Sequence, residues 1–248
     1  MIVFICMCAI AYAEDGQPDI STLFLQANQA YKSGDFNAAA DGYEKLVAAG
    51  LGNGELLYNL GNAFLKKSDI GSAIFNYRKA ELFMPRDADL EANLLFALGQ
   101  ATDRIDCSDS DSLLKTACFW YAKLSCSELC YLFLAVNCIF WLLLIVKFFI
   151  RAEMLGISLY ITLFLSLLFG GSFGVKLYNT AYICSGVVLA GEVMVRSGSS
   201  SSDTVLFKLH EGAELAVDDR ENEWLKIRLC DGKKGWVQKS CVGIISGS

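Results

Sequence analysis

The sequence contains a single histidine, His210, among its 248 residues. A histidine-based zinc site or a Ser-His-Asp triad would have to use His210, and no residue near it in the sequence has the spacing of a matching ligand. Ten cysteines are present, but none forms the C-x-x-C pair of zinc ribbons and redox motifs. We therefore predict a protein that is not an enzyme and that carries no metal or cofactor.

Positive charge is also scarce, with 21 Lys and Arg against 27 Asp and Glu, a net charge of −6 and a pI of about 4.9. A general nucleic-acid-binding role is excluded, because a phosphate backbone needs a basic protein face. Hydrophobic residues make up 54% of the chain, and the mean hydropathy is +0.40. These values are high for a soluble protein and indicate membrane segments.

The first residues have the pattern of a secretory signal. Residues 2–10 are an apolar run, and Ala11-Tyr12-Ala13 follows in the small-x-small pattern of a cleavage site, with Glu14 and Asp15 after it. The run is too short to cross a bilayer, which takes about 20 residues. We predict a signal peptide over 1–13. Since the positively charged start of such signals is missing, an uncleaved apolar leader is the alternative.

Residues 20–53 and 54–87 repeat the same residue types at an offset of 34. The pairs include Leu23 and Leu57, Asn28 and Asn62, Asp35 and Asp69, Ala39 and Ala73, and Tyr43 and Tyr77. An offset of 34 is the period of a helix-turn-helix repeat, whose small residues let helices approach and whose large ones fill the space between units. The stretch LLYNLGNAFLKKSDIGSAIFNYRKAELFMP (56–85) resembles the tetratricopeptide family, and residues 22–47 resemble it less closely. The resemblance implies an all-α solenoid over 20–104, capped by a helix from Asp87 to Arg104.

In that family the first helix of each unit lines a groove that binds partner proteins. The corresponding positions here are Phe24, Asn28, Tyr31 and Lys32, then Tyr58, Asn62, Leu65 and Lys66. The resemblance implies that the asparagines hydrogen-bond a peptide backbone and that the tyrosines supply contact area. The family's clamp for a C-terminal carboxylate is not implied, because Phe24 and Tyr58 occupy the places of its basic residues. Alternatively, all these residues only stabilise a short solenoid.

Two apolar stretches follow an acidic linker and an amphipathic interfacial segment, which together cover 105–128. Residues 129–146 and 154–175 contain no charged residue. The second stretch would be about 33 Å long as a helix, enough to cross a bilayer. We predict two transmembrane helices, 129–150 and 154–175, with Asn137 bonded to the neighbouring helix or to a partner helix.

The short connection between the two stretches sets the predicted orientation of the chain. Lys147 and Arg151 lie there, and basic residues in short loops favour the cytoplasmic side. We therefore predict a multi-pass protein of the inner (cytoplasmic) membrane, with the repeats and the C-terminal domain on the extracytoplasmic side.

Residues 187–245 change to short alternating stretches separated by turns. These predicted strands are 187–195, 205–209, 213–218, 224–230 and 235–237, with a hairpin signal at Asp231-Gly232. Five short strands in about 60 residues predict a small barrel. We expect His210 to face a turn, and the sequence does not identify a partner for it. Cys230 can form a disulfide with either Cys241 or Cys184.

The stretch 192–242 resembles the bacterial SH3 family through VRSG (195–198), LHEG (209–212), EWLKI (223–227) and DGKKGWV (231–237). The resemblance implies an all-β SH3-like barrel over 184–245. Such barrels dock cell-wall peptides or proteins, or only pack against their own protein. Trp224 and Trp236 are the candidate contact residues, either exposed or half in the core.

The order of leader, repeats, linker, two spans and barrel resembles the BatE-type proteins of bacterial aerotolerance operons, as does the stretch NLLFALGQATDRID (93–106). The resemblance implies a membrane-anchored scaffold in an envelope complex for aerotolerance and oxidative stress, with von Willebrand A-type proteins as membrane partners. The alternative is a cysteine-based, redox-responsive membrane protein. It is motivated by eight cysteines after the leader, in a compartment that permits disulfides.

Overall fold

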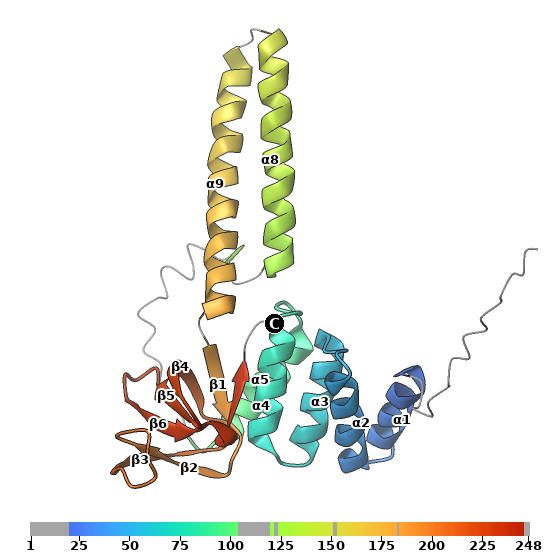
Figure 1. Ribbon diagram of the computed structural model, residues 1–248. Helices are drawn as coiled ribbons and strands as arrows, with labels where there is room; N and C mark the ends of the chain where they lie inside the picture. Colours follow the sequence, from blue (N-terminus) through green and yellow to red (C-terminus); the bar gives the residue numbers. More distant parts are fainter. Residues whose placement is uncertain (1–19, 104–119, 122–123, 151–152, 183, 246–248) are drawn as a thin grey trace, which may run out of the picture.

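The computed structural model describes residues 20–103, 120–121, 124–150, 153–182 and 184–245. Figure 1 shows a group of short helices and a small β-sheet side by side, with a long helical hairpin standing above them. The predicted leader and most of the predicted linker lie outside the described residues.

Five short helices form the N-terminal part, which we call the helical domain. They are α1 (Ile20–Lys32), α2 (Phe36–Ala48), α3 (Gly54–Lys66), α4 (Ile70–Glu81) and α5 (Ala88–Gln100). The side chains of Asp35, Asn53, Asp69 and Asp87 each accept a hydrogen bond from the backbone N–H three residues later, which starts the next helix. The turns before α2 and α4 both contain a residue with positive φ, Gly34 or Ser68, and these two residues are also 34 apart.

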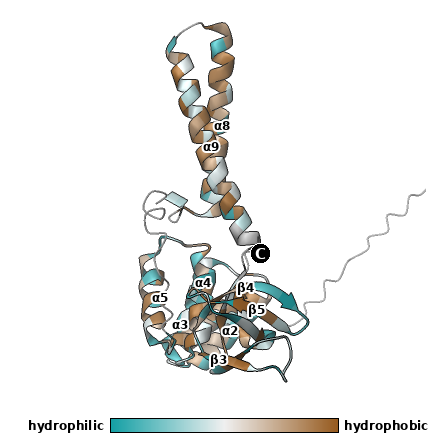
Figure 2. Cartoon of the chain, turned by 90° about the vertical axis from the view of Figure 1, so that its left-hand side faces the viewer, coloured by the Kyte–Doolittle hydropathy of each residue, from teal (hydrophilic) through white to brown (hydrophobic). Residues whose placement is uncertain are grey.

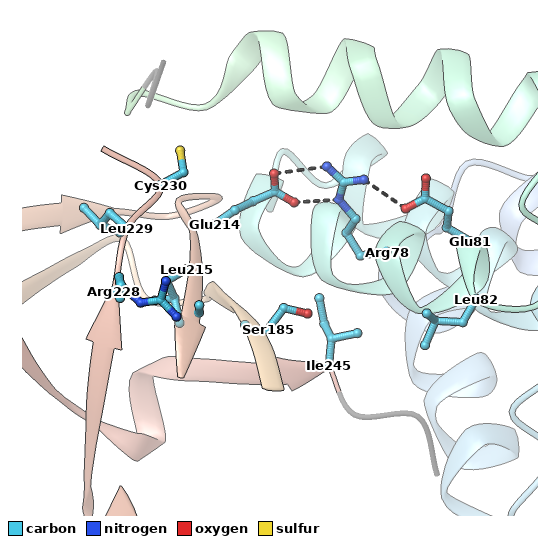
Figure 3. A pocket seen from close by; sticks show the side chains of 12 residues that line it. Arg78, Glu81, Leu82, Ser185, Glu214, Leu215, Arg228, Leu229, Cys230 and Ile245 are labelled. Atoms are coloured by element: carbon cyan, nitrogen blue, oxygen red, sulfur yellow. Dashed lines mark hydrogen bonds and ion pairs between the residues drawn. The ribbon is translucent and has the colours of Figure 1, made fainter. Parts of the chain in front are cut away.

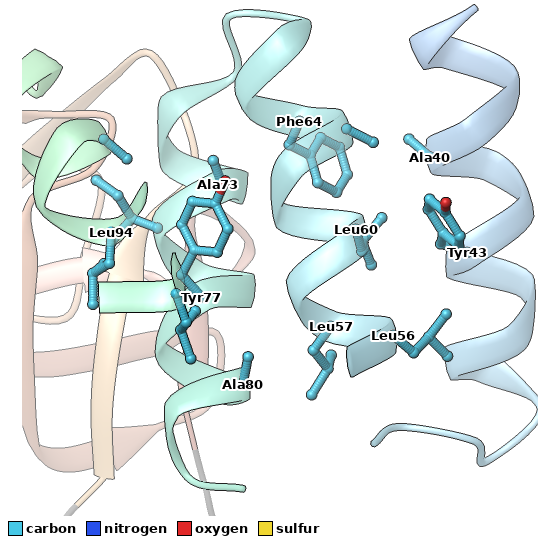
Figure 4. Packing of buried hydrophobic residues seen from close by; sticks show 14 of the residues in the cluster. Ala40, Tyr43, Leu56, Leu57, Leu60, Phe64, Ala73, Tyr77, Ala80 and Leu94 are labelled. Carbon is cyan, nitrogen blue, oxygen red and sulfur yellow. The ribbon is translucent and has the colours of Figure 1, made fainter. Parts of the chain in front are cut away.

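The core of the helical domain is formed by residues from all five helices. Figure 4 shows the part of it that α2, α3, α4 and α5 contribute. Tyr43 and Tyr77 are fully buried, together with Leu57 and Ile74. Each such side chain stabilises the fold by roughly 1.5–3 kcal/mol. A Cβ on Gly42 would lie 2.8 Å from the Cβ of Ala27, so α1 and α2 touch at small residues. The predicted roles of the small and large repeat positions are confirmed by this packing.

The hairpin consists of α8 (Cys126–Phe149) and α9 (Glu153–Tyr182). Two segments are long and apolar enough to cross a membrane: α8 itself, with 24 residues, and Glu153–Tyr178 of α9, with 26. Figure 2 shows hydrophobic residues along most of both helices. Asn137 donates a hydrogen bond to Ser166 of α9 over 3.4 Å, so Asn137 contacts the neighbouring helix, one of its two expected partners.

The C-terminal part is one antiparallel sheet in the order β3-β2-β6-β5-β4-β1-β7. Its strands are β1 (Cys184–Val188), β2 (Glu192–Arg196), β3 (Val205–His210), β4 (Glu214–Glu221), β5 (Trp224–Arg228), β6 (Lys234–Gln238) and β7 (Val242–Ile245). The prediction of one strand over 187–195 is wrong. Val187 and Val188 are both buried, so the alternation of buried and exposed residues ends there. The chain then leaves β1, which pairs with β4 and β7, and enters β2, which pairs with β3 and β6.

Helix α4 packs directly against β1 and β7. A Cβ on Gly71 would lie 2.6 Å from the backbone oxygen of Val188, and one on Gly243 would lie 2.7 Å from the ring of Phe75. Val187 and Ile245 are buried in the same cluster as the core of the helical domain. The sheet and the helices therefore share apolar packing, which the sequence did not predict.

Two polar contacts reinforce this interface. Arg78 of α4 donates from Nε and Nη2 to the carboxylate of Glu214, over 2.6 and 3.1 Å. Asp103 accepts from the backbone N–H of His210 over 2.6 Å, and its other oxygen lies 3.0 Å from Nδ1 of His210. The partner of His210 that the sequence did not identify is therefore Asp103, at the end of the helical domain.

Candidate partner-binding surfaces

The first candidate surface is made by α1, α3 and α5, and we call it the α1/α3/α5 face. A cavity of about 130 Å³ opens on it, lined by Asn28, Tyr31, Lys32, Tyr43 and Asn59. Three of the predicted groove residues, Asn28, Tyr31 and Lys32, therefore meet at one hollow. Burial is the main cause that raises the pKa of Tyr31 and Tyr43, so both phenols stay protonated and neutral at physiological pH.

Both predicted groove asparagines use their side-chain oxygens inside the domain. Asn28 Oδ1 accepts from the hydroxyl of Tyr43 over 2.6 Å, and Asn62 Oδ1 accepts from the hydroxyl of Tyr77 over 2.7 Å. Asn93 of α5 donates to Asn62 Oδ1 and to the hydroxyl of Tyr58, each over 2.9 Å. The amide oxygens thus hold the face in shape, so the expectation that these asparagines hydrogen-bond a peptide now rests on their amide nitrogens.

The other predicted groove residues differ in exposure. Phe24 is half-buried against Tyr43, with ring centroids 6.3 Å apart, and Leu65 is half-buried against the core. Tyr58 is half-buried with its ring centroid 6.0 Å from that of Tyr77, and Lys66 is exposed.

Three residues of the face were missed in the sequence. Asn59 and Asn93 are 34 residues apart, as are Asn62 and Phe96, so the repeat period could have found them. Phe96 leaves 59% of its surface exposed on α5. Aromatic residues, phenylalanine included, are enriched at protein–protein interfaces, so Phe96 is a candidate contact residue.

A second hollow, of about 510 Å³, lies between the helical domain and the sheet (Figure 3). Its lining residues are Arg78, Glu81, Leu82, Ser185, Gly186, Glu214, Leu215, Ala216, Arg228, Leu229, Cys230 and Ile245. The guanidinium of Arg78 is occupied by two carboxylates, since Nη1 also donates to Glu81 over 2.9 Å. The charges of Arg78, Glu81 and Glu214 on this side of the hollow are thus paired with one another.

The third candidate surface is the outer side of β5 and β6. Leu225 and Val237 point into the core, whereas Trp224 and Trp236 are half-buried. Lys226 is the cross-strand partner of Trp236, and its Nζ lies 5.9 Å from the ring centroid, within reach of a cation–π interaction. Trp224 and Lys226 lie on the same side of β5, and Lys226 lies opposite Trp236 on β6. The two tryptophans are therefore on the same side of the sheet.

The cysteines of the described part are in two states. Cys230 is disulfide-bonded, whereas Cys126, Cys130, Cys138 and Cys241 are free. The pairing of Cys230 with Cys241 is therefore wrong. Only the backbone of Cys184 is described, so the other pairing stays a prediction.

No group of three or more histidine, cysteine, aspartate or glutamate side chains that could hold a metal ion occurs within the described residues.

Part of the chain matches a known protein family. Residues 191–243 match the bacterial SH3 domain. The SH3 match covers β2 to β6 and the start of β7, and β1 lies before it. Ser185, Gly186 and Ile245, which line the hollow at the interface, also lie outside the matched range. No curated protein matches the chain.

Proposed function

We propose that this protein is a membrane-anchored scaffold without enzymatic activity. A tetratricopeptide-type solenoid binds a segment of a partner protein, the hairpin α8–α9 spans the membrane, and the SH3 domain contacts a second protein or a cell-wall peptide. The observation that carries the proposal is the α1/α3/α5 face, where a small hollow, a polar network and the exposed Phe96 lie on consecutive repeats.

The chemistry of this face suits an extended peptide segment. Tyr31 and the exposed Phe96 supply apolar contact area, while Lys32 and Lys66 add positive charge at the C-terminal ends of α1 and α3. Because the network of tyrosine and asparagine side chains is already formed, binding does not have to order these groups first.

Two observations support an extracytoplasmic position for both domains. Lys147 lies in the last turn of α8, Arg151 follows α8 in the sequence, and basic residues in such a short connection favour the cytoplasm. Cys230 is disulfide-bonded, and disulfides persist in oxidising compartments. We place the protein in the inner membrane as a multi-pass component of a BatE-type envelope complex, with von Willebrand A-type membrane proteins as partners in aerotolerance and oxidative stress.

The test is co-purification from detergent-solubilised membranes with the native chain, with Phe96→Ala and with Leu206→Ala. Leu206 is the matched control, because it is similarly exposed (51%) but lies on β3 of the SH3 domain. We expect a membrane protein with a von Willebrand A-type domain to co-purify with the native chain and with Leu206→Ala, and to be lost with Phe96→Ala. If the same partners persist in all three samples, the α1/α3/α5 face is not their binding site. If no partner appears in any of them, the scaffold proposal fails.

A second candidate function is a cysteine-based redox response, which one observation favours. The exposed Cys230 is disulfide-bonded, while the half-buried Cys241 of the same domain is free. Thiol alkylation followed by mass spectrometry, before and after peroxide, distinguishes the two functions. A redox-responsive protein changes the oxidation state of these cysteines, and a scaffold leaves it unchanged.

A further inference from the structure

The helical domain has two very different ends. Consecutive helices are antiparallel, so the start of α1, the α2–α3 connection and the α4–α5 connection all lie at one end of the domain. The α1–α2 turn, the α3–α4 turn and the end of α5 lie at the other end. We call the first the hairpin end, because Arg86 of the α4–α5 connection forms an ion pair with Glu128 in the first turn of α8.

Four of the seven exposed large hydrophobic residues of the helical domain lie at the hairpin end, and the other three, Leu25, Leu95 and Phe96, lie along α1 and α5. Ile20 and Phe83 each leave 53% of their surface exposed, and Leu82 leaves 43%. Leu51, in the α2–α3 connection, is also exposed. At the opposite end the turns consist of polar and small residues, and none of the described residues 32–35, 66–69 and 99–103 is an exposed large hydrophobic.

The base of the hairpin, next to the hairpin end of the helical domain, has the features of a bilayer surface. Lys176 of α9 donates from Nζ to the backbone carbonyls of Tyr121 and Leu124, and Trp120 Nε1 lies 3.3 Å from the hydroxyl of Ser172. Tryptophan, tyrosine and lysine side chains concentrate where a transmembrane helix leaves the hydrocarbon core. Figure 1 shows the α4–α5 connection directly below the first turn of α8. Leu82 and Phe83 come four and three positions before Arg86, at the end of α4 and in the connection that holds this ion pair.

We propose that the hairpin end of the helical domain lies on the membrane and that Leu82 and Phe83 insert into the lipid interface. The occupant of this apolar surface is the bilayer that α8 and α9 cross, because the surface continues from the base of the hairpin. The proposal rests on the proposed function, since it requires the hairpin to span a membrane. It adds that the helical domain is held against the lipid, with the α1/α3/α5 face oriented by that contact.

The test uses the full chain in lipid nanodiscs of zwitterionic phosphatidylcholine that carries a photoreactive diazirine near the glycerol end of one acyl chain. Zwitterionic lipid avoids repulsion from Asp87 and Asp89, which follow the apolar residues. After illumination, trypsin releases three informative peptides, 80–86, 124–147 and 197–208, whose lipid adducts are measured by mass spectrometry. Peptide 80–86 contains Leu82 and Phe83. Peptide 124–147 comes from α8. Peptide 197–208 contains the similarly exposed Leu206 of β3, a strand that Figure 1 shows far from the hairpin.

We expect peptides 80–86 and 124–147 to carry several-fold more lipid adduct than peptide 197–208. In Glu128→Gln the glutamine can still complete the capping box at the start of α8, but the ion pair with Arg86 is lost. Labelling of peptide 80–86 should therefore fall in this variant while that of 124–147 stays. If peptide 80–86 is labelled as weakly as 197–208 while 124–147 is labelled strongly, the contact proposed here is wrong and the membrane span stands. If 124–147 is not labelled either, both proposals are overturned.

Discussion

The substitution Gly71→Ala tests the contact between α4 and the SH3 domain, because its effect on stability has opposite signs with and without that contact. In a free helix, alanine is more favourable than glycine by up to about 1 kcal/mol. In the structure, a Cβ at position 71 would lie 2.6 Å from the backbone oxygen of Val188 and 3.2 Å from the Cα of Leu189. Backbone atoms cannot rotate away, so the SH3 domain would have to shift, at a cost of about 1–3 kcal/mol. We expect a net destabilisation of about 1 kcal/mol.

The assay is thermal unfolding of the full chain in detergent, for which about 1 kcal/mol corresponds to a shift of roughly 2–4 °C in Tm. Gly99→Ala is the matched control, because Gly99 is also helical and its Cβ would meet no atom within 4 Å. We expect Gly71→Ala to lower the Tm and Gly99→Ala to leave it unchanged or raise it. A Gly71→Ala variant whose Tm rises with that of the control would refute the packing of the SH3 domain on α4.

Three further predictions concern polar contacts. Arg78→Gln removes the paired hydrogen bonds to Glu214 and should lower the free energy of unfolding by about 1 kcal/mol. In a Glu214→Gln background the same substitution should cost less, and an equal cost in both backgrounds would contradict the ion pair. Asp103→Ala removes the acceptor of the His210 backbone N–H, so we expect faster hydrogen exchange at the His210 amide, and unchanged protection would speak against the contact. Burial, followed by the nearby Tyr58, raises the pKa of Tyr77 above 10.0. The unfolded tyrosine therefore ionises first as the pH rises, so the stability that is complete below about pH 10 is lost above it. The urea midpoint of Tyr77→Phe should fall less than that of the native chain between about pH 9 and pH 11, and an equal fall would refute the assignment.

The period of 34 predicts much of the helical domain because a repeat carries its packing within neighbouring residues. Tyr43 and Tyr77 were recognised as large residues that fill space, and both are fully buried. The sequence did not predict that their hydroxyls bind Asn28 and Asn62. Each of these bonds joins two helices at a separation of 15 residues, so it depends on how the helices cross.

The candidate site was predicted in part, from helical spacing. Asn28, Tyr31 and Lys32 are at positions i, i+3 and i+4 of α1, so they share one face of that helix and meet at the hollow. Whether an asparagine is available to a partner depends on neighbours such as Asn93, which comes from a helix that was predicted only as a cap. The binding of a partner at this face remains a prediction.

The sequence by itself determined the local elements of this protein: five short helices, two long apolar helices and a set of short strands that match the bacterial SH3 domain in part. The periodicity of a repeat and the length of an apolar run are properties of a few to a few tens of consecutive residues, so both can be recognised directly in the sequence. Only the tertiary structure decided that the SH3 domain packs on α4. The bonds that accompany this packing join Arg78 to Glu214 and Asp103 to His210, over 136 and 107 residues. Contacts at such separations depend on the relative placement of whole domains, which has no periodic trace in a single sequence.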